Sequence, residues 1–288
     1  AYLGSLRTPE HRSVTRSDLE AWLGKAADPD VFACSFEDSA AQDSGPWADR
    51  VILERKSVSG GGRWTHMYAD PGNTAATGET HVVGPMQVQW FGRPGPRFMV
   101  DRHHRTVPPL VAEGRIIIPG SNRILAVDAY NGTQLWDVGI HNSRRVCGPR
   151  TTSQLALEGD RLYVAAADTC WRLDLQSGAV RQVITTPQLD PEEAHDWGYV
   201  AAVDGKLLGT GARPGAIRRE MNRGAIGETY YDDRPVQTSD YLFCLDPSTQ
   251  RPIWTYKQGV IVDTTISVGE GRIFFLEAPV TPAVKDSL

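Results

Sequence analysis

The pattern of apolar and polar residues repeats along most of this chain. Each copy opens with Gly or Asp and then a basic residue, and a run of apolar and β-branched residues follows. The basic residues are Arg115, Arg161, Lys206 and Arg272, which are 46, 45 and 66 residues apart. Periods of roughly 40–50 residues that are built from short strands are typical of the blades of a β-propeller.

The second half of each copy predicts a strand, a tight turn and a further strand. An apolar run ends in Asp128, Asp174 or Asp246, and four turn-forming residues follow (AYNG, LQSG or PSTQ). A Trp stands eight residues after the Asp in the first and third copies, whereas the second copy has Gln182 there. Because one blade cannot bury both faces of its sheet, the copies must stack on each other. The predicted fold class is therefore mainly β, a β-propeller of four-stranded antiparallel blades.

The repeats do not add up to a closed ring. A fresh copy, GRIFFLEAPV, begins at Gly271, and the sequence ends before its Asp-turn-Trp half. Propellers generally need four to eight blades to close. We therefore expect an incomplete propeller, which is part of a larger polypeptide or is completed by an upstream domain or a partner chain.

The first 60 residues lie outside the repeat and predict a small α/β segment. Ser17 and Glu20 form a capping box, and apolar residues at helical spacing follow it as far as Ala27. The runs AYLGSL, VFACSF and WADRVILERKSV predict strands around this helix. We expect two parts, residues 1–60 and residues 61–288, with an insertion at about 211–238 in the second.

Composition excludes several classes of protein. The net charge of −5 and the absence of a basic stripe argue against a nucleic-acid surface. No apolar stretch approaches the roughly 20 residues that span a bilayer, so we expect no membrane span. The four cysteines form neither CxxC nor CxxCH, so a zinc ribbon and a c-type haem are not supported, and we expect no metal site.

The repeat resembles the PQQ-type (quinoprotein-type) propeller repeat, in which a strand, ALD, a T-G turn and a Trp follow each other. VDAYNGTQLW matches closely, LDLQSGAVRQ lacks the Trp, and LDPSTQRPIW lacks the Gly. The resemblance implies WD40-like blades. It does not imply a cofactor, because many proteins with this repeat bind no quinone.

The chain as a whole is similar to planctomycete-type proteins that fuse a class I methyltransferase domain to a PQQ-like propeller. The runs that carry this similarity are WTHMYADPGNTA, VQWFGRPGPRFMVDRHHR and HDWGYVAAVDGKLLGTG. It implies that residues 1–60 are the end of a methyltransferase domain, whose S-adenosylmethionine loop would lie upstream of Ala1. It also implies an extracytoplasmic (periplasmic) setting in a bacterium.

Registration of the repeats predicts where a ligand would bind. His104, Arg150 and His195 lie eleven residues before successive basic anchors, so they belong at equivalent levels of successive blades. A rim of Arg and His would attract a small anionic ligand. The alternative is that these residues are solvated or pair with Asp in the next blade. The candidate ligand-binding residues are Arg102, His103, His104, Arg105, Arg144, Arg145, Arg150, His195 and Asp196.

The insertion is the second candidate surface. Its length exceeds that of a connecting turn, and long loops are either functional or disordered. Arg218, Arg219, Tyr230 and Tyr231 are residue types enriched at recognition surfaces. The insertion is expected to be a lid or a partner-binding arm, or else a mobile surface excursion.

Three function classes compete. The first is a non-catalytic propeller that acts as a scaffold or as a ligand- or partner-binding module, with no cofactor and no catalytic residue. The second is a PQQ-dependent dehydrogenase that oxidises an alcohol or a sugar with PQQ and Ca²⁺, although the chain lacks the adjacent cysteines of such enzymes. The third is a hydrolase, which the adjacency of His195 and Asp196 disfavours. A part of an S-adenosylmethionine-dependent methyltransferase is a further alternative from the resemblance. We favour the first class.

Overall fold

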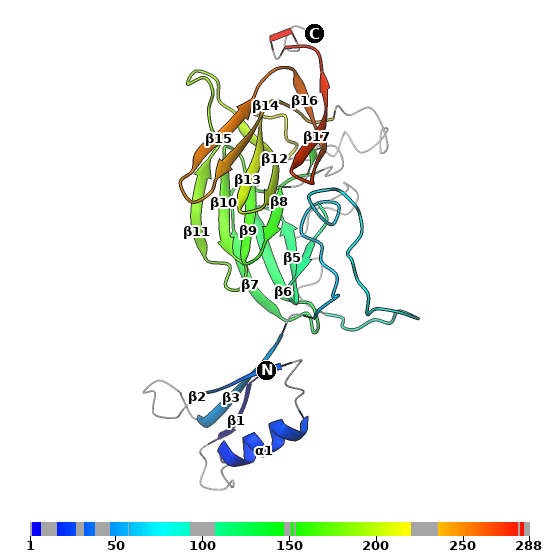
Figure 1. The fold of residues 1–288 in the computed structure, drawn as a ribbon. Coiled ribbons are helices and arrows are strands. Elements are labelled where there is room, and N and C mark those ends of the chain that lie inside the picture. The colour runs from blue at the N-terminus through cyan, green and yellow to red at the C-terminus, as the bar shows by residue number, and fades with distance from the viewer. Residues whose placement is uncertain are drawn as a thin grey trace. The chain divides into compact units, whose positions relative to one another are not determined.

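The computed structural model divides the chain into two compact units, Ala1–Gly61 and Gly62–Leu288 (Figure 1). It describes residues 2–6, 16–26, 32–37, 47–56, 58–92, 107–146, 151–152, 154–219, 236–281 and 283–284.

The first unit is a three-stranded antiparallel sheet with one helix. The sheet consists of β1 (Tyr2–Leu6), β2 (Phe32–Glu37) and β3 (Trp47–Arg55) in the order β1-β3-β2. Helix α1 (Arg16–Ala26) buries Leu19 and Leu23 against Val51 of β3. These two leucines are four residues apart and so lie on one face of the helix. The predicted α/β segment is confirmed, with the helix displaced by one residue.

The second unit contains three four-stranded antiparallel blades, which confirms the predicted fold class. Blade 1 consists of β4 (Leu110–Ala112), β5 (Arg115–Gly120), β6 (Arg123–Asp128) and β7 (Gln134–Gly139). Blade 2 consists of β8 (Leu155–Glu158), β9 (Arg161–Ala166), β10 (Thr169–Asp174) and β11 (Val180–Thr185). Blade 3 consists of β12 (Asp196–Val203), β13 (Lys206–Ala212), β14 (Thr238–Asp246) and β15 (Arg251–Tyr256).

A half-blade follows, formed by β16 (Val260–Gly269) and β17 (Arg272–Ala278). The start of β16 also pairs with the start of β14, where Ile261 lies opposite Ser239, so the half-blade and blade 3 share one sheet. Each basic residue of the sequence repeat begins the second strand of its blade. The strands β4, β8, β12 and β16 are the inner strands of the three blades and the half-blade. Of these, β8 and β12 are almost wholly buried, whereas the outermost strand β15 is mostly exposed.

Three apolar cores hold the blades together. The first joins blades 1 and 2, the second joins blades 2 and 3, and the third joins blade 3 to the half-blade. Alternate residues of one strand enter different cores, as β9 shows: Leu162 and Val164 face blade 1, and Tyr163 and Ala165 face blade 3. This alternation explains why a single blade is not stable alone.

The Asp-turn-Trp half of the repeat forms a second contact between blades. The indole N–H of Trp136 donates to the carbonyl of Leu175 at 3.0 Å, and the indole N–H of Trp90 donates to Ala129 in the same way. Each ring covers the Gly of the neighbouring turn: a Cβ on Gly178 would lie 2.7 Å from the ring of Trp136. The sequence therefore needs Gly wherever a Trp from the preceding repeat covers the turn.

The contact between blades 2 and 3 lacks both the Trp and the Gly of this arrangement. Gln182 occupies the Trp position, and its amide donates to the carbonyl of Pro247 at 2.7 Å, the same position of the next turn. That turn has Gln250 instead of Gly, with a positive φ of 58°. The two departures from the repeat thus face each other across one interface and keep the hydrogen bond.

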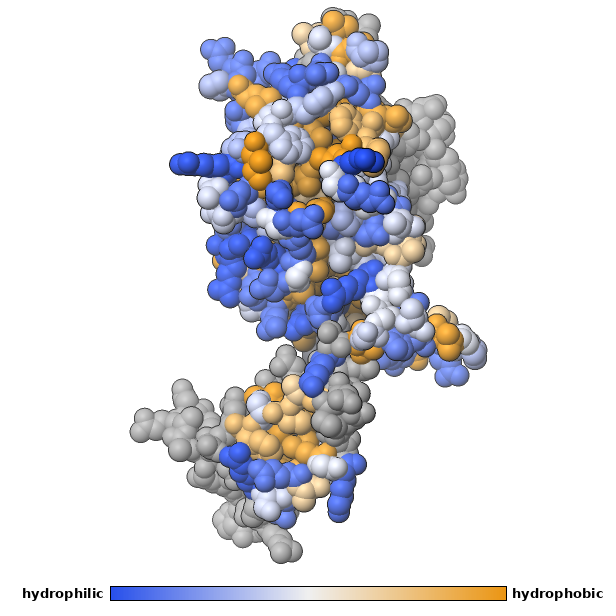
Figure 2. Space-filling view, in the orientation of Figure 1, coloured by the Kyte–Doolittle hydropathy of each residue, from blue (hydrophilic) through white to orange (hydrophobic). Residues whose placement is uncertain are grey.

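Apolar side chains also reach the surface of the second unit. Figure 2 shows orange side chains among blue ones in the upper part of this unit, where Figure 1 places β15, β16 and β17. Phe274 and Leu276 of β17 are more than half exposed, and Trp254 of β15 is 38% exposed. Phe274 occupies the repeat position of Tyr163, which is buried against the next blade. This surface therefore has the composition of a blade-to-blade interface.

Candidate functional site

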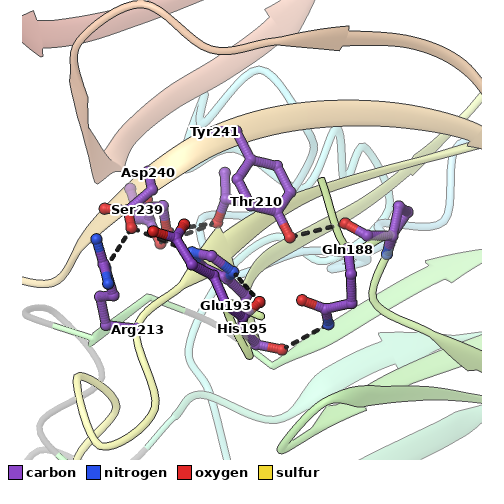
Figure 3. A network of polar contacts seen from close by, with 10 residues as sticks. Gln188, Glu193, His195, Thr210, Arg213, Ser239, Asp240 and Tyr241 are labelled. Carbon is purple, nitrogen blue, oxygen red and sulfur yellow. Dashed lines mark hydrogen bonds and ion pairs between the residues drawn. The ribbon is translucent and has the colours of Figure 1, made fainter. Parts of the chain in front are cut away.

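A buried network of polar side chains lies where the inner strands β12 and β16 begin (Figure 3). It joins residues of β12, β13, β14 and β16 to the loop before β8. We call it the polar network and define it as Arg145, His195, Asp196, Thr210, Arg213, Arg219, Gln237, Ser239, Asp240 and Asp263.

His195 is held by contacts on both ring nitrogens. Nε2 lies 3.1 Å from Oδ2 of Asp240, and Nδ1 lies 3.1 Å from the carbonyl oxygen of Glu193. The imidazole packs edge-on against Tyr241, and its side chain is 1% exposed. A carbonyl oxygen can only accept, so Nδ1 carries a proton. The second contact then requires one further proton between Nε2 and Oδ2, which makes His195 and Asp240 a tightly held pair.

Asp263, like Asp240, is a fully buried carboxylate of the network. Its Oδ2 accepts hydrogen bonds from Thr210 Oγ1 at 3.0 Å, from Ser239 Oγ at 2.7 Å and from the Gln237 amide. Burial raises the pKa of Asp263 to about 6, although these three donors act in the opposite direction. Its Oδ1 has no hydrogen-bond partner among the described residues.

Gly198 makes room for this carboxylate. A Cβ at position 198 would meet Oδ2 of Asp263 and Oγ1 of Thr210, each at 2.4 Å. Any side chain there would displace the hydrogen-bonding oxygens of Asp263. Gly198 is therefore required by the network rather than by its own backbone conformation.

Arg145 ties blade 2 to the inner strand of blade 3. Its guanidinium donates to the carbonyl oxygens of Trp197, at 2.6 Å, and of Gly198. Burial lowers the pKa of Arg145 to about 10, and the nearby carboxylates of Asp263 and Asp196 oppose that shift. The side chain thus stays charged at neutral pH and is 97% buried, which is typical of a structural arginine.

The first residues of the insertion lie against this network. Arg219 pairs with Asp196 at 2.5 Å, and Arg213 pairs with Asp240 at 2.5 Å. Their side chains are 25% and 31% exposed, so each guanidinium connects the buried network to the surface. The carbonyl of Arg218 accepts a hydrogen bond from the backbone N–H of Val146 at 2.9 Å.

The structure brings together four of the predicted site residues: Arg145, His195, Asp196 and Arg219. Arg144 lies apart from them, half-buried, with its backbone N–H 3.4 Å from Oδ1 of Asn122. Arg218 contacts Val146 through its backbone carbonyl only, and the remaining predicted residues lie outside the described part of the chain: Arg102, His103, His104, Arg105, Arg150, Tyr230 and Tyr231.

Sequence reasoning missed Asp240 and Asp263, although each interrupts an apolar run, TSDYLFCL and VIVDTTISV. A charged residue inside a buried strand must be paired or neutralised, which is the signal that would have found both.

The comparisons with known proteins agree with this fold. A family model described as outer membrane protein assembly factor BamB matches residues 74–207. The matched residues include blades 1 and 2 and the strand β12, and the match supports PQQ-like blades there. No curated protein sequence matches the chain.

Solved structures similar to the PQQ-like blades include three bacterial proteins. The quinohemoprotein alcohol dehydrogenase ADHIIG from Pseudomonas putida is 12% identical, with 76% of this chain and 45% of that chain covered and a TM-score of 0.42. The quinohemoprotein alcohol dehydrogenase from Comamonas testosteroni is 14% identical, with 70% and 28% covered and a TM-score of 0.41. BamB from Moraxella catarrhalis is 19% identical, with 59% and 56% covered and a TM-score of 0.24. This chain spans less than half the length of the two dehydrogenases.

The two described cysteines of the blades lie in different cores. Cys170 lies in the core between blades 2 and 3, and Cys244 lies in the core between blade 3 and the half-blade, so they do not form an adjacent pair. No three His, Cys, Asp or Glu side chains of the described residues are grouped to hold a metal ion. Nor is any helix among the described residues long and apolar enough to cross a membrane.

Proposed function

We propose that this chain contributes blades to a non-catalytic PQQ-like propeller that acts as a scaffold and partner-binding module. The observation that carries the proposal is the use of the polar network. Arg145 donates to backbone carbonyls of blade 3, Asp263 of the half-blade accepts from side chains of blade 3, and both ring nitrogens of His195 already face acceptors. A catalytic acid or base needs an atom directed at a substrate.

The binding surface in this proposal lies at the start of the insertion. Arg213, Arg218 and Arg219 are each partly exposed there, and the buried carboxylates of Asp240 and Asp196 anchor Arg213 and Arg219. Anchored guanidinium groups lose little freedom on binding, and they favour carboxylate or phosphate groups. The surface is therefore suited to an anionic group of a partner or a small ligand.

The proposal also includes the larger assembly to which these blades would belong. We place these blades in a larger assembly, in which an upstream domain or a partner chain completes the propeller and residues 1–60 end a methyltransferase-type domain. An extracytoplasmic bacterial location follows from the family resemblance alone. The alternative is a PQQ-dependent dehydrogenase that oxidises an alcohol or a sugar.

Calorimetric titration with inorganic phosphate at low ionic strength tests the arginine surface. We expect weak, salt-sensitive binding that falls at least threefold in Arg219→Gln, because the charge-assisted contacts are lost. Arg181→Gln is the matched control. Arg181 also pairs with an aspartate, Asp174, but Arg181 lies on the outer strand β11. Absence of binding in the wild type, or an equal loss in both variants, would contradict the proposed surface.

A further inference from the structure

Residues 64–73 run along the inner edges of the blades, a course that the sequence repeat does not predict. We call them the axial strap. Figure 1 draws this segment in cyan on the side of β5 and β8, away from the outer strands β11 and β15. His66, Met67 and Ala69 are buried there.

The strap first binds the inner strands of blades 1 and 2. Trp64 and Val111 of β4 exchange two backbone hydrogen bonds, at 2.7 and 2.8 Å. The carbonyl of Thr65 then accepts the N–H of Leu157 in β8 at 3.0 Å. An inner strand has one edge without a neighbour in its own sheet, and the strap satisfies polar groups along that edge.

The strap continues to blade 3 and to the half-blade. The ring of His66 accepts the backbone N–H of Ala202 in β12, at 3.2 Å from Nε2. The carbonyl of Pro71 accepts the N–H of Val268 in β16 at 2.7 Å, and the Asn73 amide donates to Ile266 at 2.8 Å. One segment of ten residues thus hydrogen-bonds to the inner strand of every blade.

A hydrogen-bond chain fixes the tautomer of His66. Thr65 Oγ1 donates to the carbonyl of Ala69 at 3.2 Å and so is an acceptor toward Nδ1 of His66, 2.9 Å away. Nδ1 therefore carries the proton, and Nε2 offers a lone pair to Ala202. The contact with blade 3 depends on a neutral ring.

We propose that the axial strap is a pH-sensitive latch, seated on blade 3 while His66 is neutral and released from blade 3 when His66 is protonated. A proton on Nε2 would face the N–H of Ala202, so two donors would oppose each other in a buried position. The contacts with the other inner strands involve backbone or amide groups that do not titrate. Release is therefore local to blade 3.

The electrostatics of the strap agree with this geometry. Burial lowers the pKa of His66 to about 4, whereas Asp70, the charged group of the strap that acts on the ring, raises it. A released His66 would titrate near its usual pKa of about 6.5. With these two values the ratio of released to seated strap grows roughly 70-fold between pH 7.5 and pH 4.5.

Amide hydrogen exchange of the 288-residue chain tests the latch. We expect protection of the Ala202 amide, corrected for the intrinsic exchange rate, to fall by tens-fold from pH 7.5 to pH 4.5. In His66→Gln the amide oxygen can still accept the Ala202 N–H but cannot titrate, so protection should be flat over this range. His141→Gln, which removes an exposed histidine, should behave as the wild type.

Equal loss of protection in His66→Gln, or flat protection in the wild type, would overturn the proposal. An NMR titration of the His66 ring in the wild type gives an independent answer if the variant does not fold. A midpoint well below the usual pKa, with loss of the Ala202 contact over the same pH range, supports the latch. A midpoint near 6.5, with Ala202 still protected, contradicts it.

Discussion

Replacing Asp263 by Asn tests whether burial controls the charge of the polar network. The asparagine keeps one carbonyl oxygen for the donors Thr210, Gln237 and Ser239, but it removes the negative charge. The wild-type carboxyl has its pKa raised to about 6, so the folded state binds its proton more tightly than the unfolded state does. Its contribution to stability is therefore complete below about pH 4 and is lost as pH rises through about 6.

The size of the effect follows from this shift. The change from the ordinary value of 3.8 to about 6 corresponds to about 3 kcal/mol between the fully protonated and fully ionised limits. The free energy of unfolding of Asp263→Asn minus that of the wild type should therefore increase by about 2–3 kcal/mol from pH 4 to pH 8. The variant also places an N–H₂ where Oδ1 has no partner, which costs about 1–3 kcal/mol at every pH and leaves the slope unchanged.

Urea unfolding at several pH values measures this difference. Comparison of the variant with the wild type cancels the titration of the other groups. His66 is one of them: because its pKa is lowered, it makes the fold less stable as pH falls from about 6.5 to 4, which is opposite to the effect of Asp263. Asp160→Asn is the control, because it makes the same substitution at an exposed position. A difference for Asp263→Asn that stays constant within about 0.5 kcal/mol would refute the argument from burial.

Two further predictions concern contacts between blades. Gln182→Trp alone should destabilise the fold, because the ring would meet Gln250, whereas the double change with Gln250→Gly should recover stability; a double-mutant cycle should show a coupling of at least about 1 kcal/mol. Additive effects would contradict the pairing. Arg145→Met should destabilise by about 3–5 kcal/mol, because buried carbonyls lose a charged donor and nearby carboxylates lose a positive charge, and unfolding titrations would detect this change. A loss below about 1 kcal/mol would show that Arg145 is not a structural contact.

The sequence predicted the blades well because their periodicity is local. Each basic anchor begins a second strand, and each Asp ends a third strand at a turn whose side-chain hydrogen bonds lie within a few residues, as for Asp174 and Ser177. The matched pair of Gln182 and Gln250 was visible only as two separate departures from the repeat. Their relation requires the stacking of neighbouring blades.

The candidate site was predicted less completely. Registration found His195 and placed it at the start of an inner strand, but its partner Asp240 lies on β14, beyond the insertion. The axial strap was not predicted at all, because its hydrogen bonds join Trp64 and His66 to strands 47 to 136 residues away. Contacts of this kind are set by packing around the inner strands and leave no periodic pattern.

Calorimetric titration of the chain with PQQ and Ca²⁺, combined with a dye-linked assay of alcohol and sugar oxidation, tests whether the propeller is non-catalytic. We expect neither stoichiometric binding nor turnover, because the described blades provide no adjacent cysteine pair and no grouped metal ligands. Tight, calcium-dependent binding of one quinone per chain, with oxidation of an alcohol or a sugar, would contradict a non-catalytic propeller and establish the dehydrogenase alternative.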